Sequence, residues 1–365
     1  MHYEFAKSQE RKQTSFSGLR KSAEPLADML LKPSHIIFCL LFFTIFITCK
    51  KNDNAKISEI DNLKSQTEVQ NLIRKNFKDL SKYEVKKIQD FKRNDFVCEA
   101  NVKLADELGV NESFYRTDFD KNGFTDLLII GDDFSCYGGM DESCSFRPIV
   151  LLNFGNEKYK IVNISQNFDD YYTPKIVSKN GQNLLEIYRT RIKDWENKIT
   201  YKNPQKQILA YKFDDFIEYN SNNQNYIPIQ KIEFSTSGCY GTCPVFDLEI
   251  NQNQDAKFIA KQFNFNKELE TWSDKNEGTF QTKIKDKDFN TLIKLLAYID
   301  FPQLENNYSV NWTDDQTVEL KIIYSSGKIK TISDYGASGS YGLKKVYKLL
   351  FDLRQNQNWK KIDEK

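Results

Sequence analysis

The stretch that decides the fold of this chain is Asp118–Ile130, with the sequence DFDKNGFTDLLII. Asp, Asn and Gly favour tight turns, because Asp and Asn side chains hydrogen-bond the nearby backbone and Gly tolerates positive φ. The apolar run Leu127–Ile130 follows at once and is typical of a buried strand. We therefore expect a β-turn region that leads directly into a core strand.

On the N-terminal side of this stretch, apolar residues recur at the spacing of an amphipathic helix. One such helix is expected over 67–87 and a second over 101–108. After Gly109 the pattern changes to short apolar runs separated by turn residues, which is typical of strands. The expected strands are Leu127–Ile130, Ile149–Phe154, Tyr159–Ile164, Leu184–Tyr188 and Gln207–Phe213. Residues 65–226 are therefore predicted to form a β-rich antiparallel meander domain with leading helices.

The Asn-rich segment Tyr219–Asn225 separates this part from a second expected domain, residues 227–365. Two amphipathic helices are predicted there, over Asp286–Ile299 and Tyr341–Gln355. The strands predicted around them are Ile229–Ser235, Val245–Asn251, Ala256–Phe263, Gly278–Ile284, Thr317–Tyr324 and Lys328–Ser333. Strands combined with two helices predict an antiparallel sheet with helices against one face, so the expected fold class is α+β.

The composition limits the classes of protein that this chain can belong to. Of its 365 residues, 39% are hydrophobic and 14% aromatic, which excludes a disordered chain. Its 52 basic and 51 acidic residues nearly cancel, so no field of one sign is available to attract nucleic acid. We expect no nucleic-acid partner.

Histidine is nearly absent: the two histidines are His2 and His35, and both precede Cys49. Residues after Cys49 therefore lack the commonest general base and the commonest metal ligand. The chain also has no G-x-S-x-G motif, Walker loop or dinucleotide-binding fingerprint. We assign no catalytic residue and expect a protein that is not an enzyme.

The segment 36–48, IIFCLLFFTIFIT, contains no charged residue and is followed by Cys49 and two lysines. A membrane-spanning helix needs about 20 apolar residues, and this run is shorter. It resembles the signal peptides of bacterial lipoproteins, in which the cysteine after the apolar run is lipidated and becomes the new N-terminus. The resemblance implies a removed leader, 1–48, a lipid anchor on Cys49 and a polar tether, 49–64. Met29 offers a more compact start.

This resemblance also implies a location. The protein is expected in the cell envelope, held by lipid to a membrane, most naturally the outer membrane, on its periplasmic or surface side. The membrane is then one partner through the lipid anchor, and an unknown protein or small-molecule ligand is the other.

Oxygen-bearing groups recur through the turn at the spacing of a calcium-binding loop. Side chains at positions 1, 3, 5 and 9, a Gly at position 6 and the position-7 carbonyl are ligands and turn suited to Ca²⁺. The candidate ligands are Asp118, Asp120, Asn122, the Phe124 carbonyl and Asp126. The loop resembles the calcium loops of FG-GAP and VCBS-type β-repeats. The alternative is an Asx-rich hairpin turn without a metal.

Five cysteines remain after Cys39 in the leader and Cys49 are set aside, and four of them form two close pairs. In an oxidising compartment, short-loop disulfides Cys136–Cys144 and Cys239–Cys243 are expected, with Cys98 as a buried thiol. A zinc site built from both pairs is disfavoured because the pairs lie in different expected domains.

The string Ser237–Pro244, SGCYGTCP, is the most distinctive of the second half. Here the chain resembles a family of envelope proteins of Bacteroidota that carry a Gly-Cys-x-Gly-Thr-Cys-Pro loop between their first two strands. The resemblance extends from Ile229 to Trp359 and includes Asp334-Tyr335-Gly336 before the last helix. It implies a domain of unknown function and no activity.

Three hypotheses about the function remain open. The leading one is a non-catalytic envelope lipoprotein with a binding or structural role. The second is a thiol-disulfide or hydrolytic enzyme that uses Cys239 and Cys243 or a carboxylate pair such as Asp314-Asp315 beside Trp312. The third is calcium-dependent adhesion through Asp118–Asp126. The glycine-rich loop 336–342, GASGSYG, is compatible with a phosphate cradle or with a tight packing loop.

Overall fold

The computed structural model describes residues 57–91, 96–133, 147–165, 172–189, 192–194, 199–200, 205–221, 227–264, 277–310 and 312–362. The expected leader, Cys49 and the pair Cys136 and Cys144 lie outside these ranges. Residues 54–365 form one compact unit, and that unit has hydrophobic cores of its own. Among the described residues, no helix is both long and apolar enough to cross a membrane.

The first half begins with helices α2 (Glu59–Asn62), α3 (Gln66–Asn76) and α4 (Phe96–Leu108). Ser65 begins α3 through a capping box with Glu68, in which each residue's side chain accepts a hydrogen bond from the other's backbone N–H. The expected helix over 67–87 is too long. After α3 the chain forms the short helix η1 (Lys78–Leu80) and strand β1 (Tyr83–Val85), which pairs with β4 (Gly131–Asp133).

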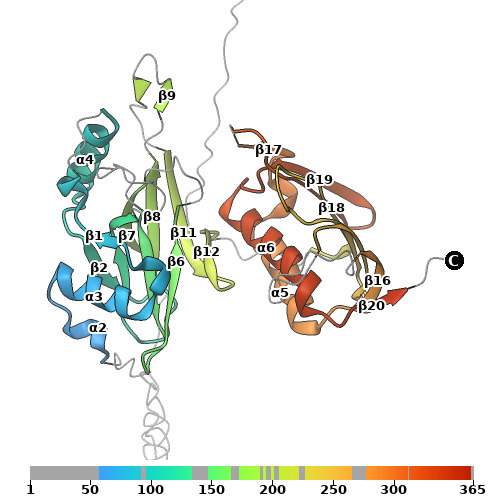
Figure 1. Cartoon of the computed structure of the whole chain (residues 1–365), viewed down its shortest axis with the longest axis horizontal. Helices are drawn as coiled ribbons and strands as arrows, with labels where there is room; N and C mark the ends of the chain where they lie inside the picture. Colours follow the sequence, from blue (N-terminus) through green and yellow to red (C-terminus); the bar gives the residue numbers. More distant parts are fainter. Residues whose placement is uncertain are drawn as a thin grey trace, which may run out of the picture. The chain divides into compact units, whose positions relative to one another are not determined.

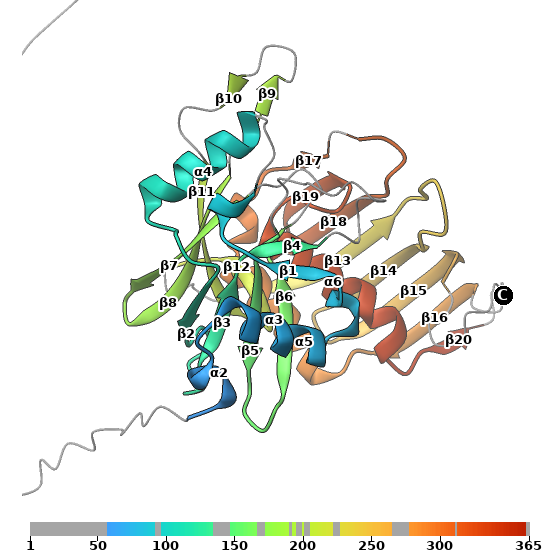
Figure 2. The same cartoon turned by 60° about the vertical axis from the view of Figure 1, so that its left-hand side comes forward.

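Two antiparallel four-stranded sheets form the body of this half (Figures 1 and 2), where the sequence predicted one meander. The first has the order β2-β3-β5-β6: Phe114–Thr117, Asp126–Ile129, Ile149–Asn153 and Tyr159–Asn163. The second has the order β12-β11-β8-β7: Asp215–Glu218, Gln205–Lys212, Gln182–Arg189 and Tyr172–Lys179. A small separate hairpin pairs β9 (Ile192–Asp194) with β10 (Ile199–Thr200).

Strand β3 is buried on both of its faces, which explains its uninterrupted apolar sequence. Leu128 lies in one core with Leu185 and Phe216 of the second sheet. Leu127 and Ile129 lie in another core, with residues of α2 and α3. The turn that precedes β3 is therefore attached to a strand in which every residue is buried.

The second half is an eight-stranded sheet of order β17-β19-β18-β13-β14-β15-β16-β20, antiparallel except for the β17–β19 pair. Helices α5 (Asp286–Tyr298) and α6 (Tyr341–Asn356) cover one face (Figure 2). The strands are Ile229–Thr236 (β13), Val245–Asn251 (β14), Asp255–Gln262 (β15), Gly278–Lys283 (β16), Asn307–Ser309 (β17), Thr317–Tyr324 (β18), Lys328–Tyr335 (β19) and Lys360–Ile362 (β20). The predicted α+β class is confirmed in this broad form.

Alternation along the strands separates the two faces of this sheet. Phe246, Leu248 and Ile250 of β14 point into the core beneath the helices. The opposite face is polar, and on it Lys231 pairs with Glu233 and Glu249 at 2.7 and 2.9 Å. Period-2 patterns of this kind are what a sheet covered on one face requires.

The start of α6 contacts the end of β12. The Glu218 carboxylate accepts hydrogen bonds from the backbone N–H groups of Tyr341 and Gly342, each at 2.8 Å. The Tyr341 hydroxyl donates to the Ile164 carbonyl at 2.9 Å, and the Tyr341 ring belongs to the core between the two four-stranded sheets. Helix α6 thus joins the cores of both halves.

Candidate functional site

The acidic loop connects β2 to β3 in the first half, where Thr117 pairs with Asp126. The Asp118 carboxylate accepts hydrogen bonds from the backbone N–H groups of Asn122 and Gly123 at 3.2 and 2.9 Å. Asp120 accepts from the Asn122 N–H at 3.1 Å. Gly123 has φ of 86°, a conformation that Gly adopts without steric cost. The sequence pattern therefore closes the loop so that its carboxylates face inward.

Three carboxylates meet in this loop. One oxygen each of Asp118, Asp120 and Asp126 lies within 4.8 Å of the others. Asp126 is fully buried, and its two oxygens accept hydrogen bonds from the backbone N–H groups of Phe119 and Asn153, each at 2.8 Å. Burial and the neighbouring Asp120 and Asp118 raise the pKa of Asp126 to about 7. Burial and the Asp118 carboxylate raise the pKa of Asp120 as well.

These charges have no cationic partner among the described side chains, since no described lysine or arginine forms an ion pair with the three carboxylates. Like charges brought together in a partly buried place repel one another and raise each other's pKa values. A bound cation would remove this repulsion and favour the ionised forms. The arrangement is therefore chemically suited to a hard divalent ion.

Asn122 and Phe124, the other two predicted ligands, hydrogen-bond to each other within the loop. The Asn122 amide nitrogen donates to Asp120 at 3.0 Å and to the Asn153 carbonyl at 2.8 Å. Its oxygen accepts from the Phe124 N–H at 2.7 Å, and the second lone pair of an amide oxygen can still ligate an ion. The structure thus brings the three predicted aspartates together and places Asn122 beside them, where its amide nitrogen donates to Asp120.

Asn153, at the end of β5, is a residue of this site that the sequence analysis missed. It is buried, and besides its bond to Asp126 its side-chain nitrogen donates to the Ser58 hydroxyl and the Thr125 carbonyl, at 3.0 and 3.2 Å. Its side-chain oxygen accepts from the Gly155 N–H at 2.9 Å. The one sequence feature that pointed to Asn153 is its place before the turn at Gly155, and an Asn in that place predicts a turn but no site.

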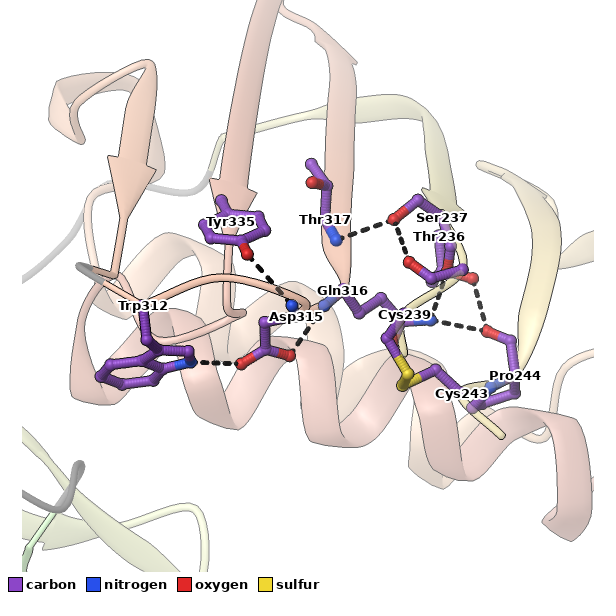
Figure 3. The surroundings of a disulfide bond; sticks show 11 residues. Thr236, Ser237, Cys239, Cys243, Pro244, Trp312, Asp315, Gln316, Thr317 and Tyr335 are labelled. Atoms are coloured by element: carbon purple, nitrogen blue, oxygen red, sulfur yellow. Dashed lines mark hydrogen bonds between the residues drawn. A yellow bond between two sulfur atoms is a disulfide. The ribbon is translucent and has the colours of Figure 1, made fainter. Parts of the chain in front are cut away.

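The second candidate is the loop between β13 and β14, where Cys239 and Cys243 form the predicted disulfide, with Cα atoms 5.7 Å apart (Figure 3). Hydrogen bonds hold both ends of the loop. The Thr236 hydroxyl donates to the Pro244 carbonyl at 2.8 Å. The Gln316 amide donates to the Ser237 and Pro244 carbonyls at 2.6 and 2.9 Å. The disulfide therefore closes a loop that the surrounding strands already position.

Among the described residues around the disulfide, the usual features that activate a thiol are not seen. A depressed thiol pKa usually requires a helix N-terminus or a neighbouring cation. Here the cysteines are followed by strand β14, and the side chains drawn around them in Figure 3 are neutral apart from Asp315. Tyr240, between the two cysteines, is 90% exposed. This geometry favours a structural bond over a centre for disulfide exchange.

The carboxylates of Asp314 and Asp315 do not form a paired site. Asp315 accepts hydrogen bonds from the Trp312 indole and the Gln316 N–H, at 2.9 and 2.7 Å, so each of its oxygens has a donor (Figure 3). Asp314 is exposed, has φ of 71° and contacts the disulfide loop through its carbonyl, which accepts the Tyr240 N–H at 3.0 Å. Both residues shape a turn before β18.

The glycine-rich loop 336–342 is a packing loop. Asp334 accepts hydrogen bonds from the Gly339 and Ser338 N–H groups at 2.8 and 3.2 Å. A Cβ atom on Gly339 would lie 2.5 Å from the Tyr308 ring. The first N–H groups of α6, which a phosphate would need, are occupied by the Glu218 carboxylate. The structure thus favours the packing interpretation over a phosphate cradle.

Removal of the Cys239–Cys243 bond is expected to cost about 2 kcal/mol of unfolding free energy, because the closed loop is very short. The double variant Cys239→Ser/Cys243→Ser should still fold, since Thr236 and Gln316 hold the loop ends. Urea unfolding of the variant and of the wild type, with and without reductant, measures this. A variant that does not fold would contradict this prediction and would show that the sheet needs the disulfide in order to fold.

Comparison with known proteins identifies one family. Residues 230–354 match the family model of a domain of unknown function, DUF6438. The match begins in β13 and ends in α6, and it includes the disulfide loop. No curated protein matches the chain, and no solved structure does.

Proposed function

We propose that this protein is a lipid-anchored envelope protein with a non-catalytic binding or structural role, and that Ca²⁺ in the loop 118–126 stabilises its first half. The observation that carries the calcium proposal is the convergence of three carboxylate oxygens within 4.8 Å, one of them on a fully buried side chain. The anchor rests on the apolar segment 36–48 and Cys49.

Calcium fits the donor set better than other common metals. Ca²⁺ takes oxygen ligands at 2.3–2.6 Å and accepts carboxylates, amides and carbonyls in flexible geometry. Two atoms that each lie about 2.4 Å from one ion are at most about 4.8 Å apart, and the three carboxylate oxygens lie within that limit of one another. Zinc or copper would favour His or Cys ligands, and the loop has neither.

The position of the loop supports a mechanical role for the ion. Residues 58–63, which the sequence analysis assigned to the end of the tether, form hydrogen bonds with this loop and its surroundings. The Thr125 hydroxyl donates to Asp61 at 2.5 Å, and Asn153 joins Ser58 to Asp126. The Arg116 guanidinium on β2 donates to the Ile60 and Leu63 carbonyls. An ion at 118–126 would therefore stiffen the place where a membrane tether enters the folded unit.

Calcium is expected to raise the melting temperature of a chain that starts at residue 54. A ligand that binds the native state at a hundredfold excess over its Kd stabilises it by about 2.7 kcal/mol, which corresponds to a shift of a few degrees. Thermal unfolding followed by circular dichroism in Ca²⁺ and in chelator measures this difference. Asp118→Asn/Asp120→Asn should abolish the shift, because it removes two ligand charges.

Glu107→Gln is the matched control, since Glu107 is an exposed acidic residue of α4 outside the loop 118–126. It should keep the full calcium response. Equal melting temperatures in Ca²⁺ and chelator, or an unchanged response in the double aspartate variant, would reject a calcium site at 118–126.

A further inference from the structure

A pocket of about 650 Å³ lies beside helix α5 and is separate from both loops described above. Its walls come from the turns that end β7 and β11, the segment after β12, and one side of α5. The volume is in the range of small-molecule sites, which commonly lie where separate structural units meet. Neither the acidic loop nor the disulfide loop contributes a residue to it.

Aromatic side chains form a prearranged apolar wall. The rings of Phe213 and Tyr298 pack edge to face with centroids 5.7 Å apart. The Asn220 N–H donates to the Tyr298 hydroxyl at 3.0 Å, and the Asn220 side chain donates to the Tyr298 carbonyl at 2.8 Å. These bonds fix the Tyr298 ring before any ligand arrives, which lowers the entropic cost of binding.

Phe213 occupies a backbone conformation that is costly for a bulky residue. It has φ of 54° and Asp214 has φ of 64° in the two-residue turn between β11 and β12. Such turns favour Asn-Gly, and a large aromatic residue with positive φ is an outlier. Strained backbone conformations concentrate at functional sites, where the strain is tolerated because it holds a side chain in the position that the function requires. The ring of Phe213 lines the pocket as a result.

The charges around the pocket are positive. Lys212 and Lys294 line it, and no carboxylate is among its described lining residues. The Lys212 ammonium lies 5.6 Å from the centre of the Tyr298 ring. Of the neighbouring carboxylates, Asp214 pairs with Lys160 at 2.6 Å, and Glu218 accepts from the first N–H groups of α6. Neither lysine forms an ion pair with a described carboxylate.

We propose that this pocket binds a small organic anion with an aromatic or other flat apolar body. The body would lie against the Phe213 and Tyr298 rings, and the anionic group would face Lys212 and Lys294. This inference deepens the binding role proposed above and rests on it, but it requires neither the lipid anchor nor calcium.

Two fluorescent probes of nearly the same shape test the proposal: anilinonaphthalene sulfonate, which is anionic, and N-phenylnaphthylamine, which lacks the sulfonate. The chain from residue 54 is titrated with each probe in calcium-containing buffer. The anionic probe should bind about fivefold to tenfold more tightly, because two solvent-exposed lysines add only modest attraction. Lys212→Gln/Lys294→Gln should remove this preference and leave the neutral probe unchanged.

Two further variants complete the test. Lys257→Gln/Lys287→Gln changes the net charge equally at exposed residues outside the pocket and should behave as the wild type. Ala297→Trp places a bulky ring in the pocket and should weaken both probes at least about tenfold. Near-ultraviolet circular dichroism checks that each variant is folded.

Equal affinity for the two probes, or binding that survives both Lys212→Gln/Lys294→Gln and Ala297→Trp, would overturn the proposal. Such a failure is distinct from a failure of the anchor or calcium proposals, because those are measured by lipid labelling and by melting temperature. A folded protein with a normal calcium response and no charge preference would reject the pocket ligand alone.

Discussion

Replacing Cys49 by serine is expected to abolish lipid labelling of the protein and to release it from the membrane fraction. The physical reason is the length of the preceding segment: 36–48 has 13 residues without charge, and a spanning helix needs about 20. Acyl chains contribute about 0.8 kcal/mol per buried CH₂ group, and two or more chains hold a protein stably to a bilayer. Metabolic labelling with clickable palmitate, followed by membrane fractionation, measures both effects.

Cys39→Ser is the matched control, because Cys39 lies inside the same apolar segment and has no role in the proposed anchor. Its labelling and fractionation should equal those of the wild type. Labelling that persists in Cys49→Ser, or a wild-type protein that takes up no label, would remove the basis for the envelope location.

Replacing Phe246 by alanine is expected to lower the unfolding free energy by about 3–5 kcal/mol, the usual cost of deleting a large buried ring. Phe246 is fully buried on β14. Its ring lies 5.4–5.7 Å from the rings of Phe234, Phe258 and Phe351. The cavity would open between the sheet and α6, where the aromatic contacts cannot re-form. Urea unfolding of the chain from residue 54 measures the loss.

Phe263→Ala is the comparison, since Phe263 follows β15 and is 37% exposed. Its replacement should cost well under half as much, because less area is removed from the core. A loss below about 1 kcal/mol for Phe246→Ala would contradict the packing of α6 against β14.

The elements of the second half could be predicted because their periodicity is strong. The alternation Phe246, Leu248, Ile250 appears directly in the sequence, and so does the apolar stripe of α5, with Leu292, Leu295 and Leu296 buried. The Cys239–Cys243 bond could also be predicted, since nearby cysteines on a turn are within disulfide reach. The acidic loop was recognisable for the same reason: its three aspartates are close in sequence.

The spacing of apolar residues gave wrong predictions where contacts with residues distant in the sequence decide the local structure. Tyr83 continues the helical spacing of α3, yet it lies in β1, because it pairs with Asp133 and its hydroxyl donates to the Arg147 carbonyl at 2.6 Å. Strand β7 was missed because its sequence, YTPKIVSK, carries a proline and few core residues. One predicted meander became two sheets because Leu128 and Leu185 bury each other across the core.

The sequence by itself determined the α+β class, the elements with strong periodicity, the aspartate loop and the disulfide, because each depends on neighbours within a few residues. Only the tertiary structure decided that Asn153 supports the aspartates, that Glu218 binds the start of α6, and that Phe213 and Tyr298 enclose a pocket with two lysines. Asn153 lies 27 residues from Asp126, and Glu218 lies 123 residues from Tyr341. Contacts over such separations leave no local pattern, because packing and desolvation select them only after the strands and helices have assembled.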